Sequence, residues 1–554
     1  MTTSPGRSDI RSTLVALLTA AVTVAAAATL VTTTPAAEAA VLAAAVEDEG
    51  AGCAVPALPE AGALPTIARL PDPFTKLNGQ RITSTAEWQC RRAEIKKLAE
   101  KFVYGEKPAK PASVTGTVSS TGITVNVSHN GRSSSFSAKV ELPGGSGPFP
   151  AVVVLGGFGA DTAAIKAAGA AVINYDPYVV GREGTPRTNK QGAFYSIYGA
   201  SSSTGLLVAW AWGVSRIIDV IEQSNGGILR ADATGVTGCS RFGKGAIVTG
   251  AFDQRIALTM PIESGSAGAP IFRGIPGEGA QSLSSAYGEQ PWLGDAFGSF
   301  TSSPTRLPVD THELVAMVAP RGLFIMDNPH IANLGPRSAS VAALGGAEVY
   351  KALGAGANIT YWSDVQDGSH CANRAEWRTP LQQHIQKFLL GTGSAPGAMR
   401  ISSRAAGNLA EWRDWSTPTL TSTPPTTGSP TPSAPSPSAP SPSAPSSGSP
   451  SPSNPVPGAG CTATVSVNAW TGGFVATVKV TAGAAGTTGW NVGLTVPAGA
   501  TVTNSWNANR TGTSGAVQFS NVTHNGRIAA GQATEFGFQA SGSAGAMTPT
   551  CSAS

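Results

Sequence analysis

The chain has 554 residues, which is more than one ordinary domain and predicts at least two folded units. Its formal net charge is only +4, and charged residues make up 13% of it. A chain of this composition lacks the dense basic surface that neutralises phosphates, which excludes a nucleic-acid partner.

The first 39 residues have the features of a secretion signal. Arg7 and Arg11 precede an alanine-rich apolar run over 14–31, and residues 37–39 (AEA) fit a small-residue cleavage site. A single membrane anchor is the alternative, but threonines interrupt the run and it is short for a span. No later stretch is apolar enough to cross a bilayer. We therefore expect residues 1–39 to be a signal peptide and the protein to be extracellular, without a membrane partner.

The six cysteines are an even number, which in an exported chain favours disulfides over metal or redox sites. No two of them have the C-x-x-C spacing that is typical of zinc sites, so we expect no metal. The six are Cys53, Cys90, Cys239, Cys371, Cys461 and Cys551.

Residues 40–397 alternate apolar runs with helical patterns, which predicts an α/β domain with parallel strands. The runs 150–157 (PAVVVLGG) and 170–176 (AAVINYD) are typical of strands that are buried on both faces. Residues 204–223 have helical spacing, and a short strand over 233–238 is followed at once by a second helical pattern.

Ser240 lies at the turn between that strand and helix, in the sequence GVTGCSRFGKGA (235–246). Such a turn lifts a hydroxyl above the sheet, next to the helix N-terminus, where an oxyanion would be stabilised. The sequence fits the G-x-S-x-G elbow only in part, because Phe242 replaces the second glycine and Gly243 comes one place late. From these residues alone, Ser240 is either a nucleophile or an ordinary serine in a turn.

Two carboxylates are candidates for the acid that would accompany a serine nucleophile. The α/β-hydrolase arrangement supplies its residues in the order Ser, acid, His. Glu263 ends the next predicted strand after Ser240, and Asp327 ends the strand after that, which is the more usual position. Their positions do not choose between them, and either could instead cap a loop or a helix.

His370 is the preferred base, because it follows the apolar run 359–363 and so lies at the C-terminal end of a predicted strand. His330, on a loop after another strand, and His312, at a predicted helix start, are weaker candidates.

Two cysteines adjoin these candidates, since Cys239 precedes Ser240 and Cys371 follows His370. A disulfide between them would hold the nucleophile beside the base. Two unpaired buried cysteines are the alternative, which export disfavours.

Residues 398–459 form a predicted linker, which from residue 416 onward is rich in Pro, Ser and Thr and contains a short internal repeat. Residues 460–554 alternate small β-forming residues with Gly/Asn turns, which predicts an all-β, immunoglobulin-like sandwich. Cys461 and Cys551 would close the ends of this module. Tethering raises the effective concentration of one module near the target of the other.

Several motifs together resemble a known family. GCSRFGKGA (238–246) is similar to the G-C-S-R-x-G-K-x-A signature of glucuronoyl esterases, carbohydrate esterase family 15. The resemblance continues through PIESGSAGAP, QSLSSAYGEQPWLGD, LPVDTHELVAMVAPRGLF and DGSHCA, and so covers roughly residues 85–392. It implies an α/β-hydrolase fold, a three-layer sandwich, with no cofactor.

The resemblance also implies roles for the candidate residues. Ser240 is then the nucleophile, His370 the general base and Glu263 the orienting acid, and Asp327 becomes the second choice. Arg241 is implied to help hold the oxyanion. The disulfides implied by the family are Cys53 with Cys90 and Cys239 with Cys371.

A sugar-binding set of Lys244, Gln281 and Glu289 is implied in the same way. Lys244 lies one helical turn after Ser240 and can donate to a sugar oxygen, while the other two add acceptors. Without the family, Lys244 is better interpreted as a solvated helix charge and Glu289 as a loop carboxylate. Fungal members carry a tryptophan where this chain has Asn333, which bears on affinity for the uronate but not on the triad.

The C-terminal motifs NAWTGGF, GWNVGLTVPAG, NSWNAN and ATEFGFQASG resemble a carbohydrate-binding module of family 2. This resemblance implies that Trp470 and Trp506 stack on cellulose or xylan and that Trp490 lies in the core. His524 stands where the family usually has a third aromatic residue, so we expect weaker binding than on a face of three tryptophans.

These inferences predict a secreted, monomeric esterase with two modules. Its substrate would be the ester between 4-O-methyl-D-glucuronic acid of glucuronoxylan and lignin alcohols in lignin–carbohydrate complexes. The rivals are an acetyl xylan or feruloyl esterase of the same fold and a carbohydrate-binding protein with an inactive hydrolase domain. The sugar-binding set argues against the first rival, and the intact triad argues against the second.

Overall fold

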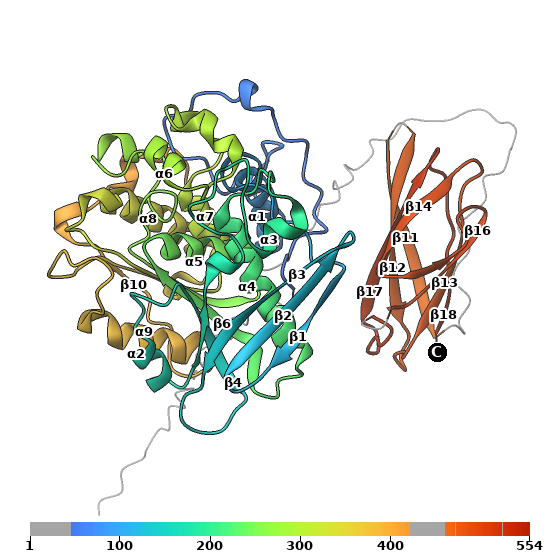
Figure 1. Ribbon diagram of the computed structural model, residues 1–554. Coiled ribbons are helices and arrows are strands. Elements are labelled where there is room, and N and C mark those ends of the chain that lie inside the picture. The colour runs from blue at the N-terminus through green and yellow to red at the C-terminus, as the bar shows by residue number, and fades with distance from the viewer. Residues whose placement is uncertain (1–45, 422–459, 471, 523–524, 554) are drawn as a thin grey trace, which may run out of the picture. The chain divides into compact units, whose positions relative to one another are not determined.

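The computed structural model describes residues 46–421, 460–470, 472–522 and 525–553 (Figure 1). The chain divides into two compact units, with the boundary between Thr431 and Pro432. The predicted signal peptide and the predicted linker from residue 422 onward lie outside the described residues. Within the described part of the chain, no helix combines the length and the apolar character that a membrane span requires.

One mixed sheet forms the centre of the first unit. Its strands are β1 (Ser113–Val118), β2 (Gly122–His129), β3 (Arg132–Glu141), β4 (Phe149–Leu155), β5 (Ala171–Tyr175), β6 (Leu229–Cys239), β7 (Ile256–Ile262), β8 (Gly322–Met326), β9 (Ile359–Trp362) and β10 (Ala398–Arg400). Their order is β1-β2-β3-β5-β4-β6-β7-β8-β9-β10. β1, β2 and β3 join the sheet through antiparallel pairings, and the pairings from β5 to β10 are parallel.

Helices cover both faces of this sheet and produce the predicted three-layer α/β-hydrolase sandwich (Figure 1). They are α1 (Thr85–Ala99), α2 (Thr162–Ala167), α3 (Ala193–Tyr198), α4 (Leu206–Gln223), α5 (Arg241–Phe252), α6 (Leu283–Glu289), α7 (Thr311–Val318), α8 (Pro336–Ala352) and α9 (Ala375–Phe388). Successive residues of a strand point to opposite faces. Accordingly, Val152 and Val154 of β4 pack with α2 and α9, whereas Val153 and Leu155 pack with α4 and α5.

The sequence patterns predict the central elements better than the edge. The predicted apolar runs form β4 and β5, and the predicted helix over 204–223 forms α4. The antiparallel strands β1 to β3 are not evident as apolar runs, because they bury only every second residue. In β2 these buried residues are Ile123, Val125 and Val127.

Residues 398–421, which were expected to begin the linker, instead belong to the first unit. β10 extends the sheet beside β9. The indole of Trp415 is buried and donates from Nε1 to the Leu70 carbonyl at 3.1 Å. The Thr421 N–H donates to the Thr83 carbonyl at 3.0 Å. An apolar indole gains free energy by leaving water, which explains why this segment folds back onto the domain.

The second unit is a β-sandwich. Its strands are β11 (Cys461–Trp470), β12 (Gly473–Ala482), β13 (Trp490–Thr495), β14 (Thr501–Trp506), β15 (Asn509–Thr511), β16 (Ala516–Ser520), β17 (Ala533–Ser541) and β18 (Thr550–Ala553). They form two four-stranded antiparallel sheets, β11-β12-β17-β14 and β15-β16-β13-β18. The Cys461–Cys551 disulfide joins one sheet to the other.

The module core contains Trp490, as predicted. Its ring is fully buried, and its Nε1 donates to the Asn525 carbonyl at 2.8 Å. Trp470 and Trp506 close β11 and β14. The side chains of both tryptophans, and all of His524, lie outside the described residues.

Candidate active site

Ser240 occupies the turn between β6 and α5 with φ 60° and ψ −124°. A residue other than glycine rarely adopts a positive φ, and such strained positions gather at functional sites. The Ser240 N–H donates to the Ile262 carbonyl at 2.9 Å, and its carbonyl accepts from the Lys244 N–H at 3.0 Å. These bonds tie the turn to β7 on one side and to α5 on the other.

Two glycines allow this turn. A Cβ on Gly238 would lie 2.7 Å from the Phe242 carbonyl oxygen, and one on Gly243 would lie 2.5 Å from that of Ile262. Gly243 therefore permits the close approach of α5 to β7. The Phe242 ring is buried and packs 5.6 Å from the Trp210 ring. The departure from the G-x-S-x-G pattern thus follows from packing and leaves the elbow intact.

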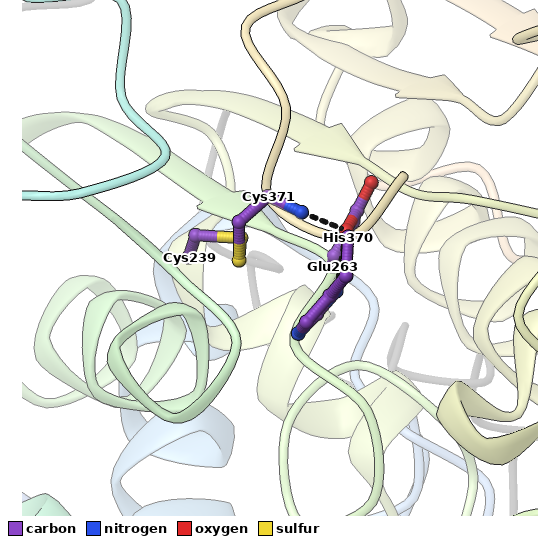
Figure 2. Close-up of side chains that lie close together, drawn as sticks. All are labelled: Cys239, Glu263, His370 and Cys371. Atoms are coloured by element: carbon purple, nitrogen blue, oxygen red, sulfur yellow. Dashed lines mark hydrogen bonds and ion pairs between the residues drawn. A yellow bond between two sulfur atoms is a disulfide. The ribbon is translucent and has the colours of Figure 1, made fainter. Parts of the chain in front are cut away.

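Glu263 follows β7 directly, and its side chain is fully buried. Its Oε2 accepts from His370 Nδ1 at 2.6 Å and from the Cys371 N–H at 2.7 Å (Figure 2). Its Oε1 accepts from Asn328 Nδ2 at 3.2 Å. Because Nδ1 of His370 donates to the carboxylate, Nε2 is left to accept a proton.

A disulfide brings the loops of His370 and Ser240 together. Cys239 and Cys371 are bonded, with their Cα atoms 5.8 Å apart (Figure 2). One side-chain atom from each of these cysteines, Glu263 and His370, a sulfur, a carboxylate oxygen or a ring nitrogen, lies within 4.8 Å of the other three. The two sulfurs bind each other and offer no thiolate ligands, so the cluster is not a zinc-type site. Cys53 and Cys90 form a further disulfide, as the resemblance implied.

Asp327 has different partners. Its Oδ1 accepts from the Asn328 N–H at 2.9 Å, and its Oδ2 accepts from the Tyr361 hydroxyl at 2.8 Å. Burial raises the pKa of Asp327 to about 7. The carboxylate that contacts His370 is therefore that of Glu263.

The two other candidate bases, His312 and His330, have their Nε2 atoms within hydrogen-bond distance of backbone carbonyl oxygens. His312 is buried in α7 with Nε2 2.9 Å from the Pro71 carbonyl oxygen, and burial lowers its pKa to about 4. His330 has Nε2 2.9 Å from the Val365 carbonyl oxygen.

The predicted sugar-binding residues lie near Arg241. Gln281 Nε2 donates to Glu289 Oε2 at 2.6 Å, and Arg241 Nη2 lies 3.8 Å from Glu289 Oε1. Lys244 is buried, and its Nζ donates to the Ser264 carbonyl. Burial lowers the pKa of Lys244 to about 7, although the Glu289 carboxylate opposes this effect. The interpretation of Lys244 as a solvated helix charge is therefore wrong.

Asn333 lies beside this set, since its carbonyl accepts from the Gln281 N–H at 3.0 Å. Glu183 is a neighbour that no sequence motif marked. It pairs with Arg241 Nη1 at 2.7 Å, from a loop that is 58 residues away in the chain. A single carboxylate in a loop carries no local signal of such a partner.

Two family models match the chain. One is described as "Glucuronyl esterase, fungi" and covers residues 125–354, and the other as "Cellulose binding domain" and covers 461–553. The 4-O-methyl-glucuronoyl methylesterase of Hypocrea jecorina is 38% identical over 377 residues, which are 67% of this chain and 80% of that protein. The protein of the same name from Neurospora crassa is 39% identical over 370 residues, which are 65% of this chain and 92% of that protein.

A solved structure agrees with these matches. It is a mutant glucuronoyl esterase from Sporotrichum thermophile in complex with methyl 4-O-methyl-β-D-glucopyranuronate, with a TM-score of 0.62 and 37% identity. The match covers 67% of this chain and 100% of that one. The chain therefore belongs to the glucuronoyl esterases, carboxylic ester hydrolases of carbohydrate esterase family 15, and it carries a C-terminal cellulose-binding module.

Proposed function

We propose that this esterase is secreted and cleaves the ester between 4-O-methyl-D-glucuronic acid of glucuronoxylan and lignin alcohols. The relative that was solved in complex with methyl 4-O-methyl-β-D-glucopyranuronate supports the uronate as the acyl group. Three disulfides within the described residues favour an oxidising compartment. A cellulose-binding module fits an enzyme that acts on plant cell walls.

The observation that carries the proposal is the contact of Glu263 with His370 at the elbow of Ser240. The carboxylate holds Nδ1 of the imidazole at 2.6 Å, and the Cys239–Cys371 disulfide links the two loops. A serine, an imidazole and a buried carboxylate in this relation are the parts that nucleophilic ester hydrolysis requires.

In the proposed reaction, Ser240 Oγ attacks the uronoyl carbonyl carbon while His370 Nε2 takes its proton. Arg241 and the first backbone N–H groups of α5 stabilise the oxyanion of the tetrahedral intermediate. The intermediate collapses to an acyl-enzyme, and His370 returns the proton to the departing alcohol. Water then attacks the acyl-enzyme with His370 as base, which releases the uronic acid and restores Ser240. Glu263 orients the imidazole and stabilises its charged form.

Lys244, Gln281 and Glu289 would bind the hydroxyls of the uronate ring. The ammonium of Lys244 donates, and the carboxylate of Glu289 accepts. Both lie close to Arg241 or to the turn of Ser240, so a ring held by this set would present its carboxyl carbon to Ser240.

A comparison of ester substrates tests the proposed specificity. The purified enzyme should hydrolyse methyl 4-O-methyl-glucuronate with a higher kcat/KM than an aryl acetate or methyl ferulate, and Ser240→Ala should abolish turnover while its thermal transition is retained. A preference for the acetyl or feruloyl ester would support the rival esterase activity. Undiminished turnover by Ser240→Ala would remove Ser240 from the mechanism.

We further propose that the module binds cellulose or xylan through Trp470 and Trp506. Deleting residues 422–554 should leave the rate on a soluble ester unchanged but lower retention on insoluble polysaccharide. In depletion isotherms on crystalline cellulose, Trp470→Ala and Trp506→Ala should each weaken binding, and His524→Trp should strengthen it by about 1 kcal/mol. Equal retention with and without the module would refute this role.

A further inference from the structure

Glu183 accepts hydrogen bonds from three side chains and so connects two of them to the third, that of Arg241, the residue after Ser240. Its side chain is 8% exposed, on the loop between η3 (Pro177–Val179) and α3. Its Oε2 accepts from the Tyr178 hydroxyl at 2.8 Å and from Arg241 Nη1 at 2.7 Å. Its Oε1 accepts from Trp292 Nε1 at 2.5 Å. Three donors from separate segments therefore converge on one carboxylate.

Two of these donors belong to the surroundings of the nucleophile. Arg241 is the residue after Ser240. The ring of Trp292 lies 5.6 Å from the Arg241 guanidinium and 5.2 Å from Lys244 Nζ, distances at which a cation interacts with an aromatic face. Glu183 thus fixes the arginine directly and fixes the indole that both cations contact.

The third donor, the Tyr178 hydroxyl, keeps its proton and therefore keeps its hydrogen bond to Glu183. Burial and the hydrogen bond to Glu183 raise the pKa of Tyr178 to about 12. The phenol therefore remains a donor at any pH at which the enzyme would be assayed. The loop itself is fastened at the next residue, because the Gly184 N–H donates to Gln290 Oε1 at 2.7 Å.

A second carboxylate competes for the same arginine. Glu289 Oε1 lies 3.8 Å from Arg241 Nη2, and its side chain is 38% exposed. The Arg241 side chain is 35% exposed, so it has room to move. Without Glu183, the guanidinium would lose its buried partner, and Glu289 would become the nearest carboxylate.

We infer that Glu183 is a positioning residue, which holds Arg241 toward the developing oxyanion and away from Glu289. The inference rests on the proposed function, in which Arg241 stabilises the oxyanion. An arginine that is already oriented loses less conformational freedom when charge develops in the transition state. A second consequence is that Glu289 stays available for the sugar.

The test is a double-mutant cycle on kcat with methyl 4-O-methyl-glucuronate. Arg241→Ala should lower kcat by about 100-fold, as expected for the loss of one oxyanion donor. Glu183→Gln should lower kcat by about tenfold, because the amide keeps the shape but loses the ion pair. If Glu183 acts through Arg241, adding Glu183→Gln to Arg241→Ala should change kcat less than twofold. A purely structural role would not produce this loss of additivity.

Two further variants keep the test decisive. Tyr178→Phe removes one donor to the same carboxylate but leaves the ion pair, so it should lower kcat by about two- to threefold even if Glu183→Gln folds poorly. Glu141→Gln is the matched control, since Glu141 pairs with Lys166 on the exposed side of β3, and it should leave kcat unchanged.

The possible failures are distinguishable. Full additivity of Glu183→Gln and Arg241→Ala would overturn the positioning role and leave the proposed function standing. A normal kcat for Arg241→Ala would overturn the oxyanion role of Arg241, and the inference with it.

Discussion

The ends of β7 and β8 offer a direct comparison, because each strand is followed by a buried carboxylate. The two strands are neighbours, and the Glu263 N–H donates to the Met326 carbonyl at 2.7 Å. Glu263 accepts from an imidazole and from two amide groups, whereas Asp327 accepts from a phenol and a backbone N–H. Both carboxylates are buried, so burial does not determine which of them serves as the acid. The donors that surround each carboxylate make the difference.

Replacing Glu263 should have the largest effect on the reaction. In Glu263→Gln, the neutral amide cannot stabilise a charged imidazole. Its NH2 group would also face one of the N–H groups from which the carboxylate now accepts a hydrogen bond. We expect kcat on methyl 4-O-methyl-glucuronate to fall by about 10³- to 10⁴-fold, as when the acid of a serine triad becomes an amide. Steady-state kinetics with thermal unfolding as a folding control would measure this, and a loss below tenfold would rule Glu263 out as the acid.

The disulfide beside Glu263 gives the second largest effect. Cys239 and Cys371 are separated by 132 residues, so replacing both with alanine should lower the free energy of unfolding by about 5 kcal/mol in the chain-entropy model. The change should also lower kcat, because the loop that it releases carries the Cys371 N–H, a donor to Glu263.

The Cys53–Cys90 pair is the matched control for that change. Its two cysteines are separated by 37 residues, and neither adjoins a residue of the candidate triad in the chain. Its double alanine variant should therefore unfold at a lower temperature with an unchanged kcat. Equal losses of kcat in both variants would show that the Cys239–Cys371 bond has no specific role at the site.

Asn328 donates a hydrogen bond to each of the two carboxylates. Its side chain donates to Glu263 and its backbone donates to Asp327. Asn328→Ala removes the bond to Glu263 together with the bond that Asn328 Oδ1 accepts from the His330 N–H, and it leaves the backbone bond to Asp327 in place. We expect kcat to fall by about tenfold, the cost of one hydrogen bond to a buried charged group. An unchanged kcat in the folded variant would mean that this bond does not orient the acid.

Asp327→Asn should have the smallest effect on the reaction, within about threefold in kcat, since the amide is isosteric and Tyr361 can donate instead to the Pro336 carbonyl, 3.2 Å away.

The effect of Asp327→Asn on stability should depend on pH. The pKa of Asp327 is raised from 3.8 to about 7, so the native state binds the proton more tightly than the unfolded state. This contribution is complete below about pH 4 and is lost as pH rises through 7.

The thermal midpoint of Asp327→Asn relative to the parent protein should therefore increase between pH 5 and pH 8. A difference that is constant over this range would contradict the raised pKa. A large loss of kcat would reverse the assignment of the two carboxylates.

Much of the central fold could be predicted from the sequence. The apolar runs at β4 and β5 and the helical spacing of α4 are local signals, and the structure confirms them. The strand, turn and helix around Ser240 were also recognisable, although the displaced Gly243 becomes intelligible only beside the Ile262 carbonyl.

Other parts could not be predicted, for physical reasons. The choice between Glu263 and Asp327 depends on donors that are more than 100 residues away, such as His370, and the residues by themselves left it open until the family resemblance favoured Glu263. Glu183 has no local pattern, because its partners come from three segments. The segment 398–421 did contain a signal, since Trp412 and Trp415 are unusual in a linker and the structure packs both against the domain.

Covalent labelling of the active serine would test the central claim most directly. A fluorophosphonate reacts with a serine only where a base activates it. We predict that the parent enzyme and Asp327→Asn are labelled on the peptide that contains Ser240, at similar rates, that Glu263→Gln is labelled far more slowly, and that Ser240→Ala is not labelled. A label on another serine, or slow labelling of Asp327→Asn together with normal labelling of Glu263→Gln, would contradict the account.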